Sequence, residues 1–149
     1  MYYSIGQISK MFNLPVSTIR YYDREGLFHG IERSSGIRRF SDKEVETLRV
    51  IECLKKSGME LKDIKVFLDW CSQGASTYEL RLNMFERRRQ AVEEEIARLN
   101  RVLDMINYKC WYYTRAIEDG NEDTVASLPA KDLPAGIREA YLRAHSPLS

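Results

Sequence analysis

Apolar residues recur at alternating steps of four and three from Tyr78 to Ile117, with Arg89 as the one exception, and this repeat constrains the fold more than any other feature. Such a sustained alternation is typical of the seam of a coiled coil. It predicts one helix over residues 76–118, about 43 residues and roughly 65 Å long. Ser76 and Glu79 have the spacing of a capping box at its start, and Gly120 is expected to end it. Because a lone helix cannot bury this stripe, we expect pairing with a second copy. The expected interface residues are Phe85, Val92, Ile96, Leu99, Leu103, Ile106 and Cys110.

Two short, tightly joined helices are predicted within Ser4–Leu27. Ser4 and Gln7 have the spacing of a capping box, which starts the first helix. Asn13 suits a left-handed helix end, and Pro15 pre-sets the backbone for a second start. Ile19 and Tyr22 would then face inward. The outward donors are Ser17, Thr18, Arg20, Tyr21 and Arg24. The pattern predicts a helix-turn-helix whose second helix reads DNA.

Residues 28–40 predict a two-stranded hairpin around the turn Ser34-Ser35-Gly36. Phe28 and Phe40 can dock this hairpin on the helices, which leaves arginines at its rim. Alone, the segment is read equally well as a solvated charged loop. Beside a helix-turn-helix, a wing that reaches the phosphate backbone is favoured. Two further helices, over about 41–57 and 61–73, complete a DNA-binding domain of residues 1–73, and Ser41 and Glu44 form a capping box that opens the first of them. Lys62 lies in the first turn of the last helix, either beside a phosphate or simply exposed.

The charge of the chain is nearly balanced, at +1 overall, but it is not evenly spread. Residues 1–41 hold six Lys or Arg and three Asp or Glu, which gives a local charge of +3. Residues 119–149 hold three and five respectively, which gives −2. This asymmetry supports a nucleic-acid partner for the N-terminal part. Pro-containing residues 119–149 are expected to form a short tail, a possible effector or docking segment, with a helix near 135–144.

Cysteine and histidine usage argues against several other classes of protein. Cys53, Cys71 and Cys110 are odd in number and widely spaced, so no disulfide framework is expected. No apolar run is long enough to span a bilayer and no signal peptide is seen, so we expect a cytoplasmic protein. His29 and His145 have no partners at catalytic spacing, and no phosphate loop or metal-ligand pair occurs. We therefore expect no enzyme activity, no cofactor and no metal. A coiled-coil scaffold would explain the long helix but not the donor-rich one.

Four motifs in order, SIGQISKMF, TIRYYDREGL, GIRRFSDKEV and LKKSGMELKDI, resemble the MerR family of bacterial transcription regulators. The resemblance covers nearly all of residues 1–118. It implies a mainly α, winged helix-turn-helix homodimer with a long antiparallel coiled-coil dimerisation helix. Such dimers bind double-stranded promoter DNA at a palindromic spacer that is too long for RNA polymerase. They activate transcription by kinking and untwisting that DNA.

The resemblance also implies roles for individual residues. It places the DNA contacts of the recognition helix at Ser17, Thr18, Arg20 and Tyr21. The contacts of the first wing fall at Arg38 and Arg39, and that of the second wing at Lys62. Pro15 departs from the many relatives that have a capping serine there, and proline cannot supply that oxygen.

The inducer is left open by the sequence. Cys53, in the fragment IECLKKSGM, is similar to the single cysteine of the NmlR/AdhR-like branch, which responds to aldehydes or other thiol-reactive electrophiles. Packing is the competing interpretation of Cys53, and we expect packing for Cys71 and Cys110. The cluster from Tyr108 to Tyr113 either packs against the partner's DNA-binding domain or lines a pocket for a hydrophobic small molecule. The tail is expected to be too short for an appended drug-binding domain.

Overall fold

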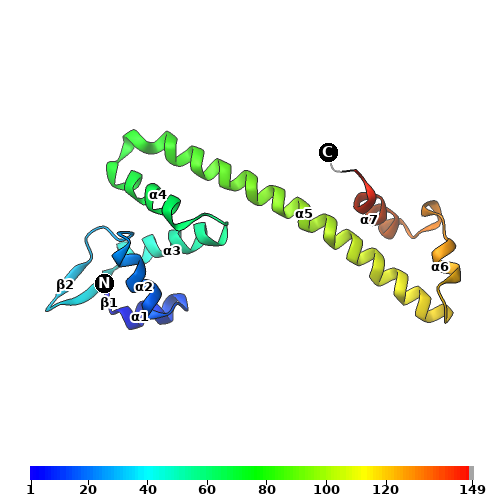
Figure 1. The fold of residues 1–149 in the computed structure, drawn as a ribbon, viewed down its shortest axis with the longest axis horizontal. Coiled ribbons are helices and arrows are strands. Elements are labelled where there is room, and N and C mark those ends of the chain that lie inside the picture. Colours follow the sequence, from blue (N-terminus) through cyan, green and yellow to red (C-terminus); the bar gives the residue numbers. More distant parts are fainter. Residues whose placement is uncertain (148–149) are drawn as a thin grey trace. The chain divides into compact units, whose positions relative to one another are not determined.

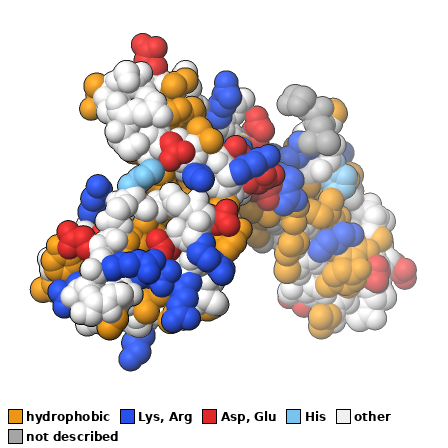
Figure 2. Space-filling model, turned by 60° about the vertical axis from the view of Figure 1, so that its left-hand side comes forward, with side chains coloured by type: hydrophobic (Ala, Val, Ile, Leu, Met, Phe, Trp, Pro, Cys, Tyr) orange, Lys and Arg blue, Asp and Glu red, His pale blue; other side chains and the backbone are white. Residues whose placement is uncertain are grey.

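The structure of the chain is a computed structural model that describes residues 1–147. Its residues group into two compact units, Met1–Arg88 and Arg89–Ser149 (Figures 1 and 2). Most of the chain is helical, with one small sheet in the first unit. The longest helix, α5 (Tyr78–Asp119), begins in the first unit and continues into the second. The predicted fold class is confirmed: a winged helix-turn-helix followed by one long helix.

The helix-turn-helix consists of α1 (Ile5–Phe12) and α2 (Val16–Arg24). The predicted capping box opens α1, because the Ser4 amide donates to Gln7 Oε1 at 2.8 Å and the Gln7 amide donates to Ser4 Oγ at 3.2 Å. Asn13 adopts the predicted left-handed conformation, with φ of 52°. Pro15 is the N-cap of α2 and supplies no side-chain hydrogen bond, so α2 starts from the preset backbone alone.

The wing is a three-stranded antiparallel sheet in the order β1-β3-β2. Its strands are β1 (Tyr2–Tyr3), β2 (Glu32–Ser34) and β3 (Ile37–Ser41). Ser35 and Gly36 join β2 to β3 with φ of 52° and 77°, which fits a type I′ turn. The predicted hairpin is therefore present. Strand β1 was not predicted, because its two residues are too few to show a strand pattern.

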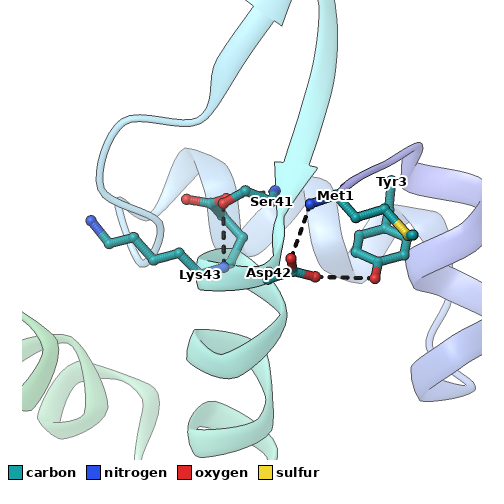
Figure 3. Close-up of polar contacts among 6 residues, drawn as sticks. Met1, Tyr3, Ser41, Asp42 and Lys43 are labelled. Atoms are coloured by element: carbon teal, nitrogen blue, oxygen red, sulfur yellow. Dashed lines mark hydrogen bonds and ion pairs between the residues drawn. The ribbon is translucent and has the colours of Figure 1, made fainter.

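Helices α3 (Asp42–Lys56) and α4 (Leu61–Gln73) close the core of the first unit. This core contains α1, α2 and the wing as well, and its fully buried side chains include Ile8, Ile19, Leu27, Phe40, Leu48, Ile51 and Ile64. The predicted capping box also opens α3, because the Ser41 amide donates to Glu44 at 2.7 Å. In Figure 3 the Asp42 carboxylate accepts from the Tyr3 hydroxyl and the Met1 amino group, which lowers the pKa of Asp42 and ties β1 to α3.

A third capping box, read from Ser76 and Glu79, is wrong. Ser76 lies inside a short 3-10 helix, η1 (Ala75–Thr77), that precedes α5. The buried Thr77 hydroxyl donates instead to the Trp70 carbonyl at 2.7 Å. Arg81 Nη2 donates to the Gly74 carbonyl at 2.6 Å, so a guanidinium supplies the hydrogen bond for this backbone oxygen at the end of α4. The first turns of α5 are thereby fixed to the end of α4.

In the second unit, the end of α5 packs with α6 (Asp123–Ser127), η2 (Ala130–Asp132) and α7 (Ala135–His145). Arg143 of α7 binds both oxygens of Asp104 at 2.9 Å. The rings of Tyr108 and Tyr141 meet at 4.9 Å. The Tyr112 hydroxyl donates to Glu122, and this hydrogen bond raises the pKa of Tyr112 to about 12. The predicted tail helix is present, and part of the aromatic cluster holds it.

The apolar seam of α5 stays uncovered in this chain. Leu99 and Leu103 are 50% and 52% exposed, and the other expected interface residues are exposed as well. The long helix ends at Asp119, and Gly120 follows with φ of 74° as predicted. Packing by α6 and α7 therefore leaves this stripe open.

Two serine substitutions test the helix starts. We expect Ser41→Ala to lower the free energy of unfolding by about 1 kcal/mol, because it removes the N-cap oxygen of α3. We expect Ser76→Ala to cost less than about 0.5 kcal/mol, because Ser76 caps no helix. Urea unfolding followed by circular dichroism measures both. Equal losses would show that our description of the start of α5 is incorrect.

Candidate nucleic-acid interface

The outer face of α2 presents the donors that the sequence predicted. Ser17, Arg20, Tyr21 and Arg24 are exposed, and Thr18 is half-buried. The opposite face holds Ile19, which is fully buried, and Tyr22, which is 2% exposed. The Arg24 guanidinium lies 6.0 Å from the centre of the Tyr21 ring, a cation–π arrangement that steadies both side chains. Burial of one face therefore fixes where the other face points.

The wing places its two predicted arginines on opposite sides of β3, because side chains alternate along a strand. Arg39 is exposed, lies 5.9 Å from the centre of the Tyr2 ring and makes no ion pair within residues 1–147. Arg38 is half-buried, and its Nε donates to Asp23 of α2 at 2.5 Å. Arg39 is thus the free cation of this pair, whereas Arg38 joins the wing to α2.

Lys62 lies in the first turn of α4 and is exposed. Its ammonium is 3.2 Å from Glu60, and this hydrogen bond raises the pKa of Lys62. Lys62 and Lys65 line a hollow of about 260 Å³ together with Tyr21 of α2. The structure therefore brings the predicted second wing beside the predicted recognition helix.

Basic side chains gather around these elements. In Figure 2 several Lys and Arg side chains lie over the lower part of the nearer unit. The exposed basic residues of the first unit include Lys10, Arg20, Arg24, Arg33, Arg39, Lys62 and Lys65. A surface of this sign attracts the phosphate backbone of DNA, although the whole chain is almost neutral.

A polar network that the sequence did not reveal attaches α2 to α3. The Tyr22 hydroxyl donates to Glu52 Oε1 at 3.1 Å and accepts from Lys55 Nζ at 2.5 Å. Burial raises the pKa of Tyr22, and the hydrogen bond to Tyr22 raises the pKa of Lys55. The phenol therefore stays neutral and the amine stays charged at neutral pH. No sequence signal joins residues 30 positions apart, so only the fold exposes this contact.

Cys53 lies on α3 between these two partners of Tyr22, and its side chain is exposed. It is not part of the core, so core packing does not account for it. Of the nearby cations, Lys55 is bound to Tyr22 and Arg49 to Glu46 at 2.8 Å. Cys71 and Cys110 are exposed too, and the expectation that Cys71 is packed is wrong. No group of three potential metal ligands occurs among the described residues.

The fold and this surface define a winged helix-turn-helix transcription regulator. The family model for MerR HTH family regulatory proteins matches residues 3–70, and the model described as MerR, DNA binding matches residues 45–108. The chain belongs to the MerR family. In the part that the structure describes, no helix has the length and apolar character needed to cross a membrane.

Two relatives and one solved structure show how far this similarity extends. An uncharacterised HTH-type transcriptional regulator of Haemophilus influenzae is 37% identical over 90% of this chain and 96% of its own length. The regulator AdhR of Bacillus subtilis is 30% identical over 61% of this chain and 66% of its own. The solved structure is the crystal structure of HiNmlR, a MerR family regulator lacking the sensor domain, bound to promoter DNA. Its sequence is 38% identical to this chain, its fold matches with a TM-score of 0.77, and the match covers 87% of this chain and 98% of that one. The NmlR/AdhR-like branch predicted from the sequence is supported.

Removal of one hydroxyl tests the α2–α3 network. We expect Tyr22→Phe to lower the free energy of unfolding by about 1 kcal/mol, because Glu52 and Lys55 lose a shared partner. The matched change Tyr21→Phe alters an exposed ring and is expected to stay within about 0.5 kcal/mol of wild type. Thermal and urea unfolding measure both variants. Similar stabilities for the two would contradict a stabilising role for the Tyr22 hydroxyl.

Proposed function

We propose that this regulator binds double-stranded promoter DNA as a homodimer and activates transcription by distorting a palindromic spacer. The observation that carries the proposal is the exposed donor face of α2, to which Arg38 joins the wing that carries the exposed Arg39. Ser17, Thr18, Arg20 and Tyr21 present hydroxyls and a guanidinium suited to base edges and phosphates. Lys62, which shares a hollow with Tyr21, and Arg39 on the wing add cations for the backbone, and such contacts fix position rather than sequence. Arg38 joins them as a wing residue held by Asp23.

The second copy is proposed from the open seam of α5. A continuous apolar stripe of this length is rarely left in water by a monomer. An antiparallel pair buries Phe85, Val92, Ile96, Leu99, Leu103, Ile106 and Cys110 against the same residues of the partner. A rigid helix pair also sets the spacing of the two reading helices. Bending a short DNA site costs on the order of 1–6 kcal/mol, and phosphate contacts from two copies offset that cost.

The partners of the complex follow from this arrangement. The dimer acts in the cytoplasm at promoters whose two elements are spaced too widely for RNA polymerase. Kinking and untwisting of the spacer bring both elements within reach of the enzyme. The relatives support this proposal, since HiNmlR is a MerR family regulator bound to promoter DNA.

For the inducer, we propose thiol-reactive electrophiles such as aldehydes, with Cys53 as the sensor. The thiolate adds to the aldehyde carbon, the oxygen takes up a proton, and a hemithioacetal forms. Cys53 is exposed, as this reaction requires. It lies on α3, the helix whose Glu52 and Lys55 hold Tyr22 of the reading helix. In this proposal an adduct on Cys53 acts through α3 on the way α2 meets DNA.

A hydrophobic effector is the second candidate, and one cavity favours it. The cavity lies between α4 and the start of α5 and has a volume of about 480 Å³. Its apolar lining includes Met59, Trp70, Leu80 and Met84, and charges of both signs come from Glu60 and Asp63 and from Arg87 and Arg88. This mixture suits a small, mainly apolar molecule that also makes polar contacts.

Two arginine substitutions test the reading surface. We expect Arg20→Ala and Arg39→Ala each to weaken DNA binding by about tenfold or more, because each removes a charged contact. Both should leave the dimer intact, because neither residue lies on the seam. DNase footprinting upstream of the protein's own gene, with light scattering for mass, measures both properties. Wild-type affinity in both variants at moderate salt would refute the proposed surface.

A cysteine substitution tests the inducer. We expect Cys53→Ser to bind DNA as wild type does but to lose activation by formaldehyde in transcription in vitro. Cys71→Ser is the matched control, because Cys71 is also exposed, and it should keep the response. An unchanged dose response in Cys53→Ser would rule out the thiol sensor and leave the apolar cavity as the candidate.

A further inference from the structure

One carboxylate of the reading helix binds both strands of the β2–β3 hairpin. Asp23 lies near the end of α2, and its side chain is only 16% exposed. Arg38 of β3 donates to it at 2.5 Å, and Arg33 Nη2 of β2 lies 3.6 Å from the same oxygen. Arg33 and Arg38 are direct cross-strand partners in the sheet. The wing therefore meets α2 through a single anion between two guanidiniums.

This anion is needed by the wing itself. Like charges directly opposite each other on neighbouring strands are destabilising, and here two arginines are paired in that way. Asp23 offsets their repulsion and accepts a charge-assisted hydrogen bond in a half-buried place, where such bonds are strong. The residues of β2 are all exposed, and besides Asp23 its side chains are held by the Tyr2 hydroxyl, which donates to Glu32 at 3.0 Å.

The position of Asp23 ties the wing to the surface that reads DNA. Its neighbour Tyr22 attaches α2 to α3, so Asp23 projects from a fixed point. Arg39, the free cation of the wing, follows Arg38 in β3. The Asp23–Arg38 contact, together with the pairing of β3 with β1, therefore fixes where Arg39 lies relative to the donors of α2.

We infer that Asp23 is a positioning residue that gives the reading surface its sequence specificity. It holds the wing at one angle to α2, and it keeps Arg33 and Arg38 from acting as mobile phosphate binders. The inference rests on the proposed DNA binding. It assigns specificity to a residue whose own charge repels DNA.

The test compares Asp23→Asn with Glu25→Gln. Glu25 lies two residues further on, is exposed and makes no ion pair in the described part of the chain, so its substitution removes the same charge without releasing the wing. The probes are a duplex that the wild-type protein selects from a random library and a shuffled duplex of equal length. Fluorescence anisotropy measures both affinities over a range of salt concentrations.

For Asp23→Asn we expect tighter binding to the shuffled duplex, with a steeper salt dependence by about 1 to 2 in slope, because two guanidiniums become free. The ratio of selected to shuffled affinity should fall about tenfold, equivalent to about 1.4 kcal/mol. For Glu25→Gln the affinities for both duplexes should rise by the same factor, so their ratio should stay unchanged. Asp23→Glu, which keeps a carboxylate, should retain most of the ratio.

Equal ratios of selected to shuffled affinity for Asp23→Asn and Glu25→Gln would overturn the inference. Asp23 would then affect DNA binding only through its negative charge. If circular dichroism shows that Asp23→Asn is unfolded, Asp23→Glu is compared with Arg38→Gln instead. The inference then requires the ratio of selected to shuffled affinity to be higher for Asp23→Glu than for Arg38→Gln. If the wild-type protein selects no duplex at all, the proposed function fails, and that result is distinct from either outcome.

Discussion

The burial of one face of α2 is the constraint on which the reading surface depends. Ile19 and Tyr22 enter the core, and the Tyr22 hydroxyl finds Glu52 and Lys55 at its far end. A buried phenol without those partners would cost free energy, so the network makes deep burial compatible with a polar side chain. Once this face is fixed, Ser17, Arg20 and Tyr21 have one direction in which to point. The rest of the first unit serves to hold α2 in that orientation.

Local signals made much of this unit predictable. The capping boxes at Ser4 and Ser41, the left-handed Asn13 and the turn before Ile37 each depend on a few neighbouring residues, and each was read correctly. Ser76 shows the limit of such signals. Its spacing to Glu79 matches a capping box, but Thr77 and Arg81 satisfy the joint through long-range bonds to the end of α4. Tertiary contacts therefore overrode a valid local pattern.

The residues of the candidate site divide in the same way. Exposure of Arg20 followed from helix periodicity, and arginines were expected at the rim of the wing without a distinction between Arg38 and Arg39. The partners of Asp23 and Tyr22 were not predicted, because they lie 10 to 33 positions away in sequence. Tyr108 was expected to meet a partner or an effector, yet in this chain its ring packs on Tyr141 of α7. Contacts of this kind depend on the fold, and no local pattern in a single sequence predicts them.

The exposed Cys110 has a practical consequence. It lies on the open seam of α5 among apolar neighbours, whereas Cys53 lies on α3, away from that seam. Association through the seam would cover Cys110 and slow its alkylation, so its reaction rate becomes a concentration-dependent gauge of assembly. The protein thus contains its own probe of self-association, which needs no label and no DNA.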